Sequence, residues 1–263
     1  MAQWNAAEYA ANSAVQLAWA RELIARLHLR GDEHILDVGC GDGKITAELA
    51  QAVPRGSATG VDASTPMIAF AREKFPSLDF QVMDARQIQS AKSFDLIFSN
   101  AALHWVDDHA AFLRGAAGVL RTGGRLVVSC GGKGNGQDVV TALHAVMRLK
   151  RWRDYFRGMP LPYFFYAPAD YQGWLPQTGF RASSVSLAPK DAIYDGFHGL
   201  ATWLRTAWLP YTQRVPEAVR EAFIAMVTER YVVRHPLDST GQVHVRMVRL
   251  EIDAVKAGEE LKR

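Results

Sequence analysis

The chain has 263 residues, of which 49% are hydrophobic and 22% are charged, and its formal net charge is +3 at pH 7. This composition is typical of a globular protein, and it excludes a disordered chain, a collagen-like fibre and a coiled coil. At roughly 100–200 residues per domain, the length fits one large domain or two small ones.

The chain carries no signal for a membrane or for secretion. No run approaches the about 18 uninterrupted apolar residues of a membrane-spanning helix, and the N-terminal segment contains Glu8 with no basic leader before it. We therefore expect no membrane partner and no secretory signal. Two cysteines, Cys40 and Cys130, are too few for a disulfide framework and predict a protein of the reducing cytoplasm.

Charge is distributed unevenly along the chain. Residues 1–140 hold 13 basic and 15 acidic residues, whereas residues 141–263 hold 17 basic and 12 acidic residues. The positive second half favours an anionic partner or substrate. The alternative is that these arginines simply cover exposed helices.

The first half alternates short apolar runs with segments of helical spacing. The predicted strands are 34–39, 57–62, 79–84, 94–100 and 125–130, and the predicted helices are 8–29, 44–52, 65–75 and 108–120. Five strands that alternate with helices predict a parallel α/β sheet with right-handed crossovers.

The second half is less regular. Its predicted helices are 138–150, 199–208 and 216–231, and its predicted strands are 185–189 and 242–253, the latter alternating as an edge strand does. About 50 residues separate these two strands, which is long for a connection in a compact domain. We interpret residues 190–238 as a helical cap over the carboxyl edge of the sheet.

The segment ILDVGCGDGKIT, residues 35–46, carries the most information about function. Asp37 ends a predicted strand, and Gly39, Gly41 and Gly43 form a turn before a helix, so that a ligand can approach the backbone closely. A dinucleotide fingerprint would need glycine at position 44, where Lys44 stands, and a phosphate-binding P-loop would need GxxxxGK[ST]. Both patterns are therefore disfavoured.

This turn resembles the first motif of the class I S-adenosylmethionine-dependent methyltransferases. Further motifs follow in the order of that family: Asp62 in GVDAS, Asp84 in VMDA, SNAALHW at 99–105, and TGGRLVVS before the fifth strand. The resemblance implies a Rossmann-like, doubly wound, mostly parallel seven-stranded sheet with an antiparallel edge strand and a helical cap. It implies one methyltransferase domain over 1–263, with a cofactor-covering helix in 1–30 and a cofactor-binding core in 31–135.

The resemblance also implies how the cofactor, S-adenosylmethionine, is held. The Asp37 carboxylate and the Asn100 carbonyl face its ammonium group, and the Asp62 carboxylate accepts both ribose hydroxyls. The adenine meets the Asp84 carboxylate and the Ala85 N–H. The apolar covers are Met67 and Trp105, and the turn itself contributes Gly39 and Gly41. Asp37 and Asp84 have the alternative role of capping the turns that follow them, and Met67 that of a core residue.

Three further segments, residues 9–19, 99–109 and 203–211, resemble the group of trans-aconitate and juvenile-hormone-acid methyltransferases. In that group an N-terminal helix folds over the cofactor. Here the helix would contribute Tyr9, Ser13, Gln16 and Trp19, with Gln16 reaching the methionine end. The alternative is a helix that only packs on the sheet.

We therefore expect a small-molecule methyltransferase that works by in-line displacement at the sulfonium methyl group. The resemblance and the positive second half favour an anionic, carboxylate acceptor, which needs no general base; N-, C- or hydroxyl-O-methylation is the alternative. His104 is the candidate catalytic residue. The candidate acceptor-binding residues are Arg205, Trp208 and Tyr211, beside His104 and Trp105.

Three rival functions are less favoured by the sequence. A nucleic-acid methyltransferase would carry [DNS]PP and an aromatic residue, but residues 99–102 read Ser-Asn-Ala-Ala. Base stacking in the cluster of Arg148, Lys150, Arg151, Trp152, Arg153 and Arg157 is less favoured than a solvated helix face. A metal-dependent enzyme is disfavoured because His104 and His109 lack paired carboxylates at ligand spacing, so we expect no metal. A cofactor-binding module without catalysis is the third rival. The sequence carries no signal for an oligomeric state.

Overall fold

A computed structural model of the chain describes residues 6 and 14–258. The chain divides into two compact units. We call the described residues of 14–133, 163–188 and 249–258 the sheet unit, and the described residues of 134–162 and 189–248 the helical unit.

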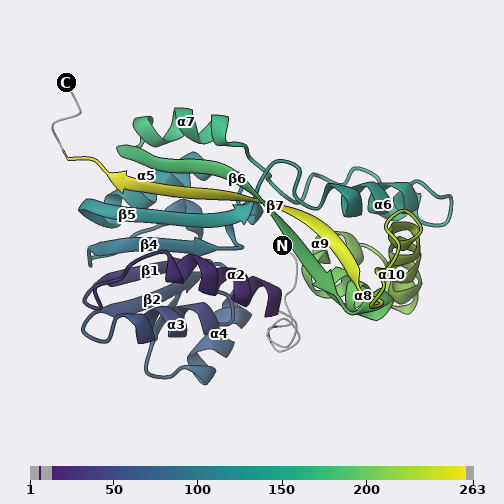
Figure 1. Cartoon of the computed structure of the whole chain (residues 1–263), viewed down its shortest axis with the longest axis horizontal. Coiled ribbons are helices and arrows are strands. Elements are labelled where there is room, and N and C mark those ends of the chain that lie inside the picture. Colours follow the sequence, from purple (N-terminus) through teal and green to yellow (C-terminus); the bar gives the residue numbers. More distant parts are fainter. Residues whose placement is uncertain (1–5, 7–13, 259–263) are drawn as a thin grey trace. The chain divides into compact units, whose positions relative to one another are not determined.

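A seven-stranded sheet in the order β3-β2-β1-β4-β5-β7-β6 organises the sheet unit (Figure 1). The strands are β1 (His34–Val38), β2 (Ser57–Asp62), β3 (Asp79–Val82), β4 (Phe94–Asn100), β5 (Leu120–Gly131), β6 (Phe180–Tyr194) and β7 (Val243–Lys256). The first five pair in parallel, and β7 pairs antiparallel with β5. The predicted fold class is therefore confirmed.

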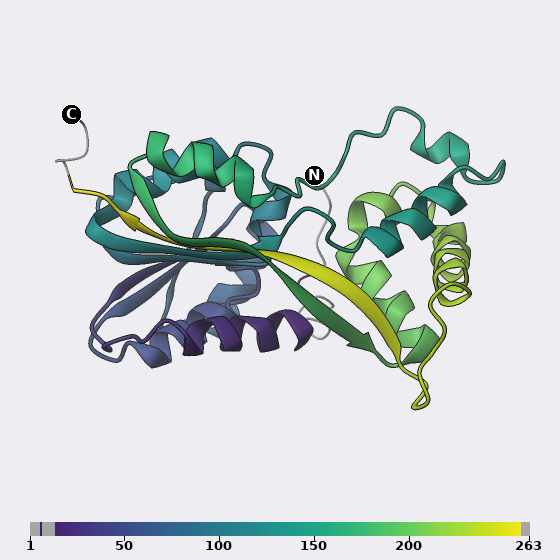
Figure 2. The same cartoon turned by 45° about the horizontal axis from the view of Figure 1, so that its top comes forward.

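Helices cover both faces of this sheet (Figure 2). They are α2 (Ala14–Ala25), α3 (Lys44–Ala52), α4 (Thr65–Lys74), α5 (His109–Val119) and α7 (Pro168–Gln177), with the short 3₁₀ helices η1 (Ala85–Gln87) and η2 (Leu103–Trp105). Neighbouring strand residues point to opposite faces, so Ile35 packs in a cluster with α2 and α3, whereas Leu36 packs in a cluster with α5 and α7. Burial on both faces explains why the central strands read as continuous apolar runs.

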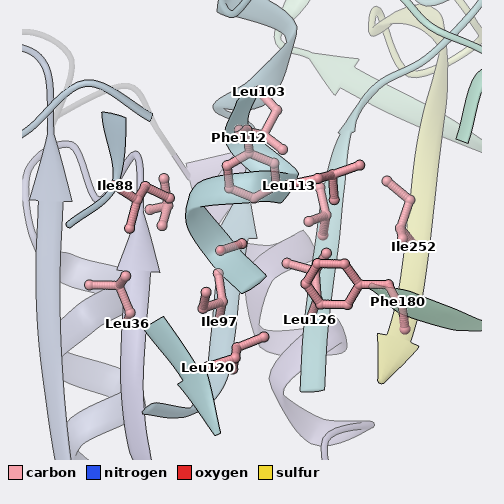
Figure 3. Packing of buried hydrophobic residues seen from close by; sticks show 14 of the residues in the cluster. Leu36, Ile88, Ile97, Leu103, Phe112, Leu113, Leu120, Leu126, Phe180 and Ile252 are labelled. Atoms are coloured by element: carbon pink, nitrogen blue, oxygen red, sulfur yellow. The ribbon is translucent and has the colours of Figure 1, made fainter. Parts of the chain in front are cut away.

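The larger cluster joins α5 to the strands in the middle of the sheet (Figure 3). Phe112 and Leu113 on α5 lie over Ile97 of β4 and Leu126 of β5, and all four side chains are buried. Burying a large apolar side chain contributes about 1.5–3 kcal/mol. This packing holds the carboxyl end of β4, where the candidate site begins.

Two elements of the sheet unit differ from the sequence prediction. Helix α7 was not predicted, because its sequence PADYQGWLPQ contains Gly173 and Pro176, which lower helix propensity. Strand β7 was expected at the edge, but it lies between β5 and β6. Its residues 249–255 pair with β5, whereas 243–248 lie beyond that pairing and alternate between buried and exposed, which gave the edge-like pattern.

The helical unit is built around α10 (Glu217–Val232), which packs against α6 (Gln137–Met147) and α8 (Gly196–Ala207). It also contains α9 (Leu209–Thr212), the 3₁₀ helix η3 (Arg153–Phe156) and the ends of β6 and β7. The three longer helices confirm the helices predicted in this part of the sequence. Strand β6 is longer than the predicted 185–189 and takes up residues 190–194 of the predicted cap.

In the described part of the chain, no helix combines the length and the apolar character that crossing a membrane requires.

Candidate functional site

The glycine turn follows β1 and leads into α3. Gly39, Gly41 and Gly43 all have positive φ angles, of 77°, 53° and 81°. A Cβ atom on Gly39 would lie 2.1 Å from the Cβ of Ala102, so no larger residue fits there without displacement of the backbone. The N–H groups of Gly39 and Cys40 both donate to the Val61 carbonyl, which ties the turn to β2. The turn is therefore tight and closely packed, as the sequence predicted.

Asp37 is buried at the end of β1. Its Oδ2 accepts a hydrogen bond of 2.7 Å from the Thr46 hydroxyl on α3. The pKa of Asp37 is raised to about 7: burial is the largest cause, the Thr46 hydrogen bond opposes it, and the carboxylates of Asp62 and Asp42 add to it. A cationic group beside Asp37 would stabilise its charged form.

Asp62 joins the end of β2 to the glycine turn. Its Oδ2 accepts from the Gly41 N–H at 3.0 Å and its Oδ1 accepts from the Ser64 N–H at 2.8 Å. Burial raises the pKa of Asp62, and these two backbone donors oppose the shift. A carboxylate has about four acceptor positions, so two remain beyond those that the backbone uses. That number suits the two neighbouring hydroxyls of a ribose.

Asp84 follows β3 and caps η1 by accepting from the Arg86 N–H. Its carboxylate also accepts from the Arg86 guanidinium, at 2.6 Å for the closest nitrogen, and this bonding lowers the pKa of Asp84. Arg86 in turn donates to Asp107. The capping alternative is thus observed. Ala85 opens η1, where the first N–H groups of a helix have no partner within it. The adenine contacts of Asp84 and Ala85 stay predictions.

Gln16 and Asn100 lie together beyond the carboxyl end of β4. The Asn100 amide donates to the Gln16 backbone carbonyl at 3.2 Å. Within the described residues, the side-chain oxygen of Gln16 is buried and has no hydrogen-bond partner. A buried acceptor costs free energy unless a donor reaches it, so an ammonium ligand fits this position. Tyr9 and Ser13, predicted on the same helix, lie outside the described residues.

Arg249 on β7 is a site residue that the sequence analysis missed. It is buried, and it donates to the Ser129 carbonyl at 2.5 Å and to the Asn100 Oδ1 at 3.3 Å. Its guanidinium also lies 5.4 Å from the centre of the Trp19 ring. It therefore fixes the orientation of the Asn100 amide. Its only signal in the sequence is one arginine within the mostly apolar run VRLEI.

His104 belongs to η2, directly after β4. The Gly131 N–H donates to its Nδ1 at 3.3 Å, so the neutral ring carries its hydrogen on Nε2. Burial, and after it the positive charge of Arg249 and the nearby His109, lower the pKa of His104 to about 3. His104 is thus neutral near pH 7 and offers a hydrogen-bond donor at Nε2 rather than a base.

Buried hydrogen bonds hold η2 in place. His109 Nε2 donates to the Leu103 carbonyl at 2.7 Å, and the Tyr171 hydroxyl donates to His109 Nδ1 at 2.5 Å. Both side chains are fully buried. Because both ring nitrogens of His109 are engaged in this way, the pairing of His104 and His109 as metal ligands has no geometric support here.

Residues 163–166 form a wall beside η2 that the sequence analysis did not identify. The Phe164 N–H donates to the His104 carbonyl, and the Lys133 N–H donates to the Tyr166 carbonyl, each at 2.9 Å. Tyr163 and Phe165 turn their rings towards His104. The available signal was the aromatic run YFFY, which no predicted element included.

Both side chains that were predicted to cover the cofactor, Met67 and Trp105, lie in the sheet unit. Met67 is buried on α4, and its N–H donates to the Ser64 hydroxyl that caps this helix. Trp105 on η2 is half-buried and packs edge-on against Tyr163. Burial of Met67 agrees with both of its predicted roles, a core residue and an adenine cover.

The remaining acceptor candidates are in the helical unit. Arg205 on α8 donates two hydrogen bonds to Glu221 on α10, of 2.8 and 2.5 Å. Trp208 and Tyr211 are buried in the same unit and pack against each other. An anionic acceptor would therefore share or displace Glu221 at Arg205. Acceptor binding by these three residues stays a prediction.

The basic cluster of residues 148–157 contains a tryptophan that is not available to a nucleic acid. Trp152 is 1% exposed and packs edge-on against Phe223. Its indole N–H donates to the sulfur of Met226. A base cannot stack on a buried ring, so the structure removes the main support for the nucleic-acid alternative.

The site thus combines this sheet order with a glycine turn after β1 and an acidic residue at the end of β2. A family model described as a methyltransferase domain matches residues 36–128. Trans-aconitate 2-methyltransferase of Escherichia coli is 30% identical over 262 residues, which cover 97% of this chain and 98% of that protein. An uncharacterized methyltransferase of Schizosaccharomyces pombe is 34% identical over 211 residues, 77% of this chain and 79% of that protein.

Solved structures show the same fold. The YcgJ protein of Bacillus subtilis is 18% identical with a TM-score of 0.61, covering 92% of this chain and 99% of that one. Magnesium protoporphyrin IX methyltransferase of Synechocystis, solved with bound S-adenosylhomocysteine, is 16% identical with a TM-score of 0.53 and covers 92% and 82%. The chain belongs to the class I S-adenosylmethionine-dependent methyltransferases, and it is an enzyme of that class.

Proposed function

We propose that this enzyme transfers the methyl group of S-adenosylmethionine to a carboxylate of a small anionic acid. The observation that carries the proposal is the state of His104, whose Nδ1 accepts from Gly131 and whose pKa is far below neutrality. A carboxylate is already deprotonated and needs no base, whereas a hydroxyl or ammonium acceptor does. The relative named trans-aconitate 2-methyltransferase, similar along nearly the whole chain, supports the same choice.

The residues around the glycine turn fit the cofactor. Asp62 has acceptor positions for the two ribose hydroxyls. Asp37 and the buried Gln16 Oε1 suit the ammonium group. Asp84, Ala85, Met67 and Trp105 would surround the adenine, and Asn100, oriented by Arg249, completes the methionine end.

The chemistry that bound S-adenosylmethionine supplies is an electrophilic methyl group on a positively charged sulfur. A carboxylate oxygen held in line would form the new bond to that carbon while the carbon–sulfur bond breaks and its electron pair stays on sulfur. The products are a methyl ester and S-adenosylhomocysteine, with no proton to remove. His104 donates from Nε2 to hold the acceptor carboxylate in line, and positioning of this kind supplies much of the rate.

Some parts of the proposal rest on the sequence alone. These are the covering role of residues 1–30, the capping role of 190–238, and one domain over 1–263 around the cofactor-binding core of 31–135. Acceptor binding by Arg205, Trp208 and Tyr211 belongs with them. Cys40 and Cys130 are both free thiols, which supports a cytoplasmic location.

The role of His104 is tested by its replacement with glutamine. The glutamine amide can donate a hydrogen bond in place of Nε2–H, so His104→Gln is expected to lower kcat/KM about tenfold or less. At saturating S-adenosylmethionine, where the protonation of free Asp37 no longer limits cofactor binding, the wild-type pH profile of kcat should lack a limb near pH 6.5. The measurement is methyl transfer from labelled S-adenosylmethionine to a panel of carboxylic acids, hydroxyls and amines.

A general base would behave differently. Its loss costs on the order of 10²–10⁴ in rate. If His104→Gln loses more than a hundredfold, and a wild-type limb near pH 6.5 vanishes with it, the acceptor is a hydroxyl or amine and the carboxylate proposal is wrong. Methylation of no acid in the panel would contradict it equally.

Asp37 makes cofactor binding dependent on pH. In the free enzyme its pKa is about 7, and an ammonium ligand favours the charged carboxylate, so binding releases a proton below that pH. The affinity for S-adenosylhomocysteine should therefore rise with pH between 5.5 and 7.5, by at most about tenfold per unit, and then level off. Calorimetry at three pH values measures this, and Asp37→Asn should flatten the dependence. Affinity that falls with pH would contradict it.

The raised pKa of Asp37 also makes the folding stability of the unliganded protein depend on pH, but in the opposite direction to cofactor affinity. A carboxyl whose folded pKa lies above its ordinary value of 3.8 contributes stability in its protonated form. That contribution is complete below about pH 4 and is lost as the pH rises through about 7. Bound cofactor and folding stability should therefore respond to pH in opposite directions, which distinguishes a binding role for Asp37 from a purely structural one.

A further inference from the structure

Four aromatic rings gather at one place in the sheet unit. His104 and Trp105 come from η2, and Tyr163 and Phe165 come from the wall of residues 163–166. The ring centres of Tyr163 and Phe165 lie 6.0 and 6.1 Å from that of His104, and Trp105 meets Tyr163 edge-on at 4.8 Å. All four residues are partly buried.

The rings of Tyr163 and Phe165 both lie beside the His104 ring. Tyr163 and Phe165 stack on each other with their centres 5.5 Å apart and their planes within 9°. Tyr166 turns elsewhere and packs on His109 and Trp174. The hydrogen bond from the Phe164 N–H to the His104 carbonyl fixes the stacked pair beside the imidazole.

We propose that Tyr163 and Phe165 determine acceptor specificity, by receiving the flat, unsaturated body of a carboxylic acid whose carboxylate is held by His104. This inference rests on the proposed function. Stacked rings present flat faces rather than charge, so they favour a planar conjugated body over a saturated chain that bends at each carbon. The His104 Nε2–H would bind the carboxylate of the acceptor, and the rings of Tyr163 and Phe165 would contact its unsaturated carbon chain.

The test compares acids that differ only in one double bond. One pair is trans-aconitate and its saturated counterpart propane-1,2,3-tricarboxylate, and the other is fumarate and succinate. Each pair keeps the number of carboxylates constant, so recognition of charge cancels. We expect the wild-type enzyme to favour the unsaturated member in kcat/KM. Tyr163→Leu and Phe165→Leu should each lower that preference by about threefold to tenfold, the range of one aromatic contact.

Control variants separate this role from a structural one. Tyr155→Leu and Phe197→Leu remove exposed rings of the helical unit and should keep the wild-type preference. Tyr163→Phe keeps the ring and should keep it too, which covers the case in which Tyr163→Leu fails to fold. Equal methylation of both members of each pair by wild type, or an equal loss for both members in the leucine variants, would overturn the inference and leave carboxylate methylation intact. If wild type methylates neither member but methylates hydroxyls or amines, both proposals fail.

Discussion

Replacement of Asp62 by alanine is expected to weaken binding of S-adenosylhomocysteine by about 10²–10⁴-fold. A hydrogen bond to a charged group contributes roughly 1.5–3 kcal/mol, and about 1.4 kcal/mol corresponds to a factor of ten. The alanine variant would lose two such bonds to the ribose, and it would also lose the hydrogen bond from the Gly41 N–H that shapes the glycine turn. Isothermal calorimetry on the purified protein measures the change.

Two controls make the Asp62 result specific. Asp79→Ala removes a carboxylate at the start of β3 that is exposed and bonds to Gln81, and it should leave the affinity unchanged. Asp62→Asn removes the charge and keeps an acceptor oxygen for only one of the two backbone N–H groups, so it should bind with an affinity between that of the wild type and that of Asp62→Ala. Wild-type affinity in a folded Asp62→Ala variant would show that the ribose does not meet this carboxylate.

The parallel half of the fold was predictable because its signals are local. Buried strands such as 94–100 read as apolar runs, and the glycines of the turn mark a backbone conformation that other residues adopt rarely. Asp37 and Asp62 could be placed because the carboxyl ends of parallel strands meet at one edge of the sheet. For Asp37 and Asp62, their positions at the ends of successive predicted strands were therefore enough to predict that the two carboxylates lie close together.

The rest of the site depends on contacts between distant parts of the chain. Arg249 reaches Asn100 across 149 positions, and the Phe164 N–H meets His104 across 60. Neither contact has a periodic pattern in the sequence. Arg205 was expected to attract an anion, but its partnership with Glu221 is visible only when α8 and α10 are packed. The sequence shows which side chains are charged, but only the tertiary structure shows which group neutralises each charge.

Replacement of Gly39 by alanine should destabilise the fold and disrupt the cofactor turn together. At φ 77° an alanine costs about 1–2 kcal/mol, and forcing its Cβ against Ala102, at 2.1 Å, adds about 1–3 kcal/mol of overpacking. The free energy of unfolding in denaturant should therefore fall by about 2–5 kcal/mol. S-adenosylhomocysteine binding should weaken as well, because the turn or residues 101–102 must shift.

The contact with Ala102 provides a direct test of this cause. Ala102→Gly removes the clashing methyl group and alone should change stability by about 1 kcal/mol or less. In the double variant it should restore about 1–3 kcal/mol of the loss, because the overpacking is gone while the backbone strain at position 39 remains. Strict additivity of the two substitutions would show that the turn does not press against residue 102. Unchanged stability of Gly39→Ala would show that the turn tolerates a side chain, and the close approach between β1 and η2 would then not be what requires glycine at this position.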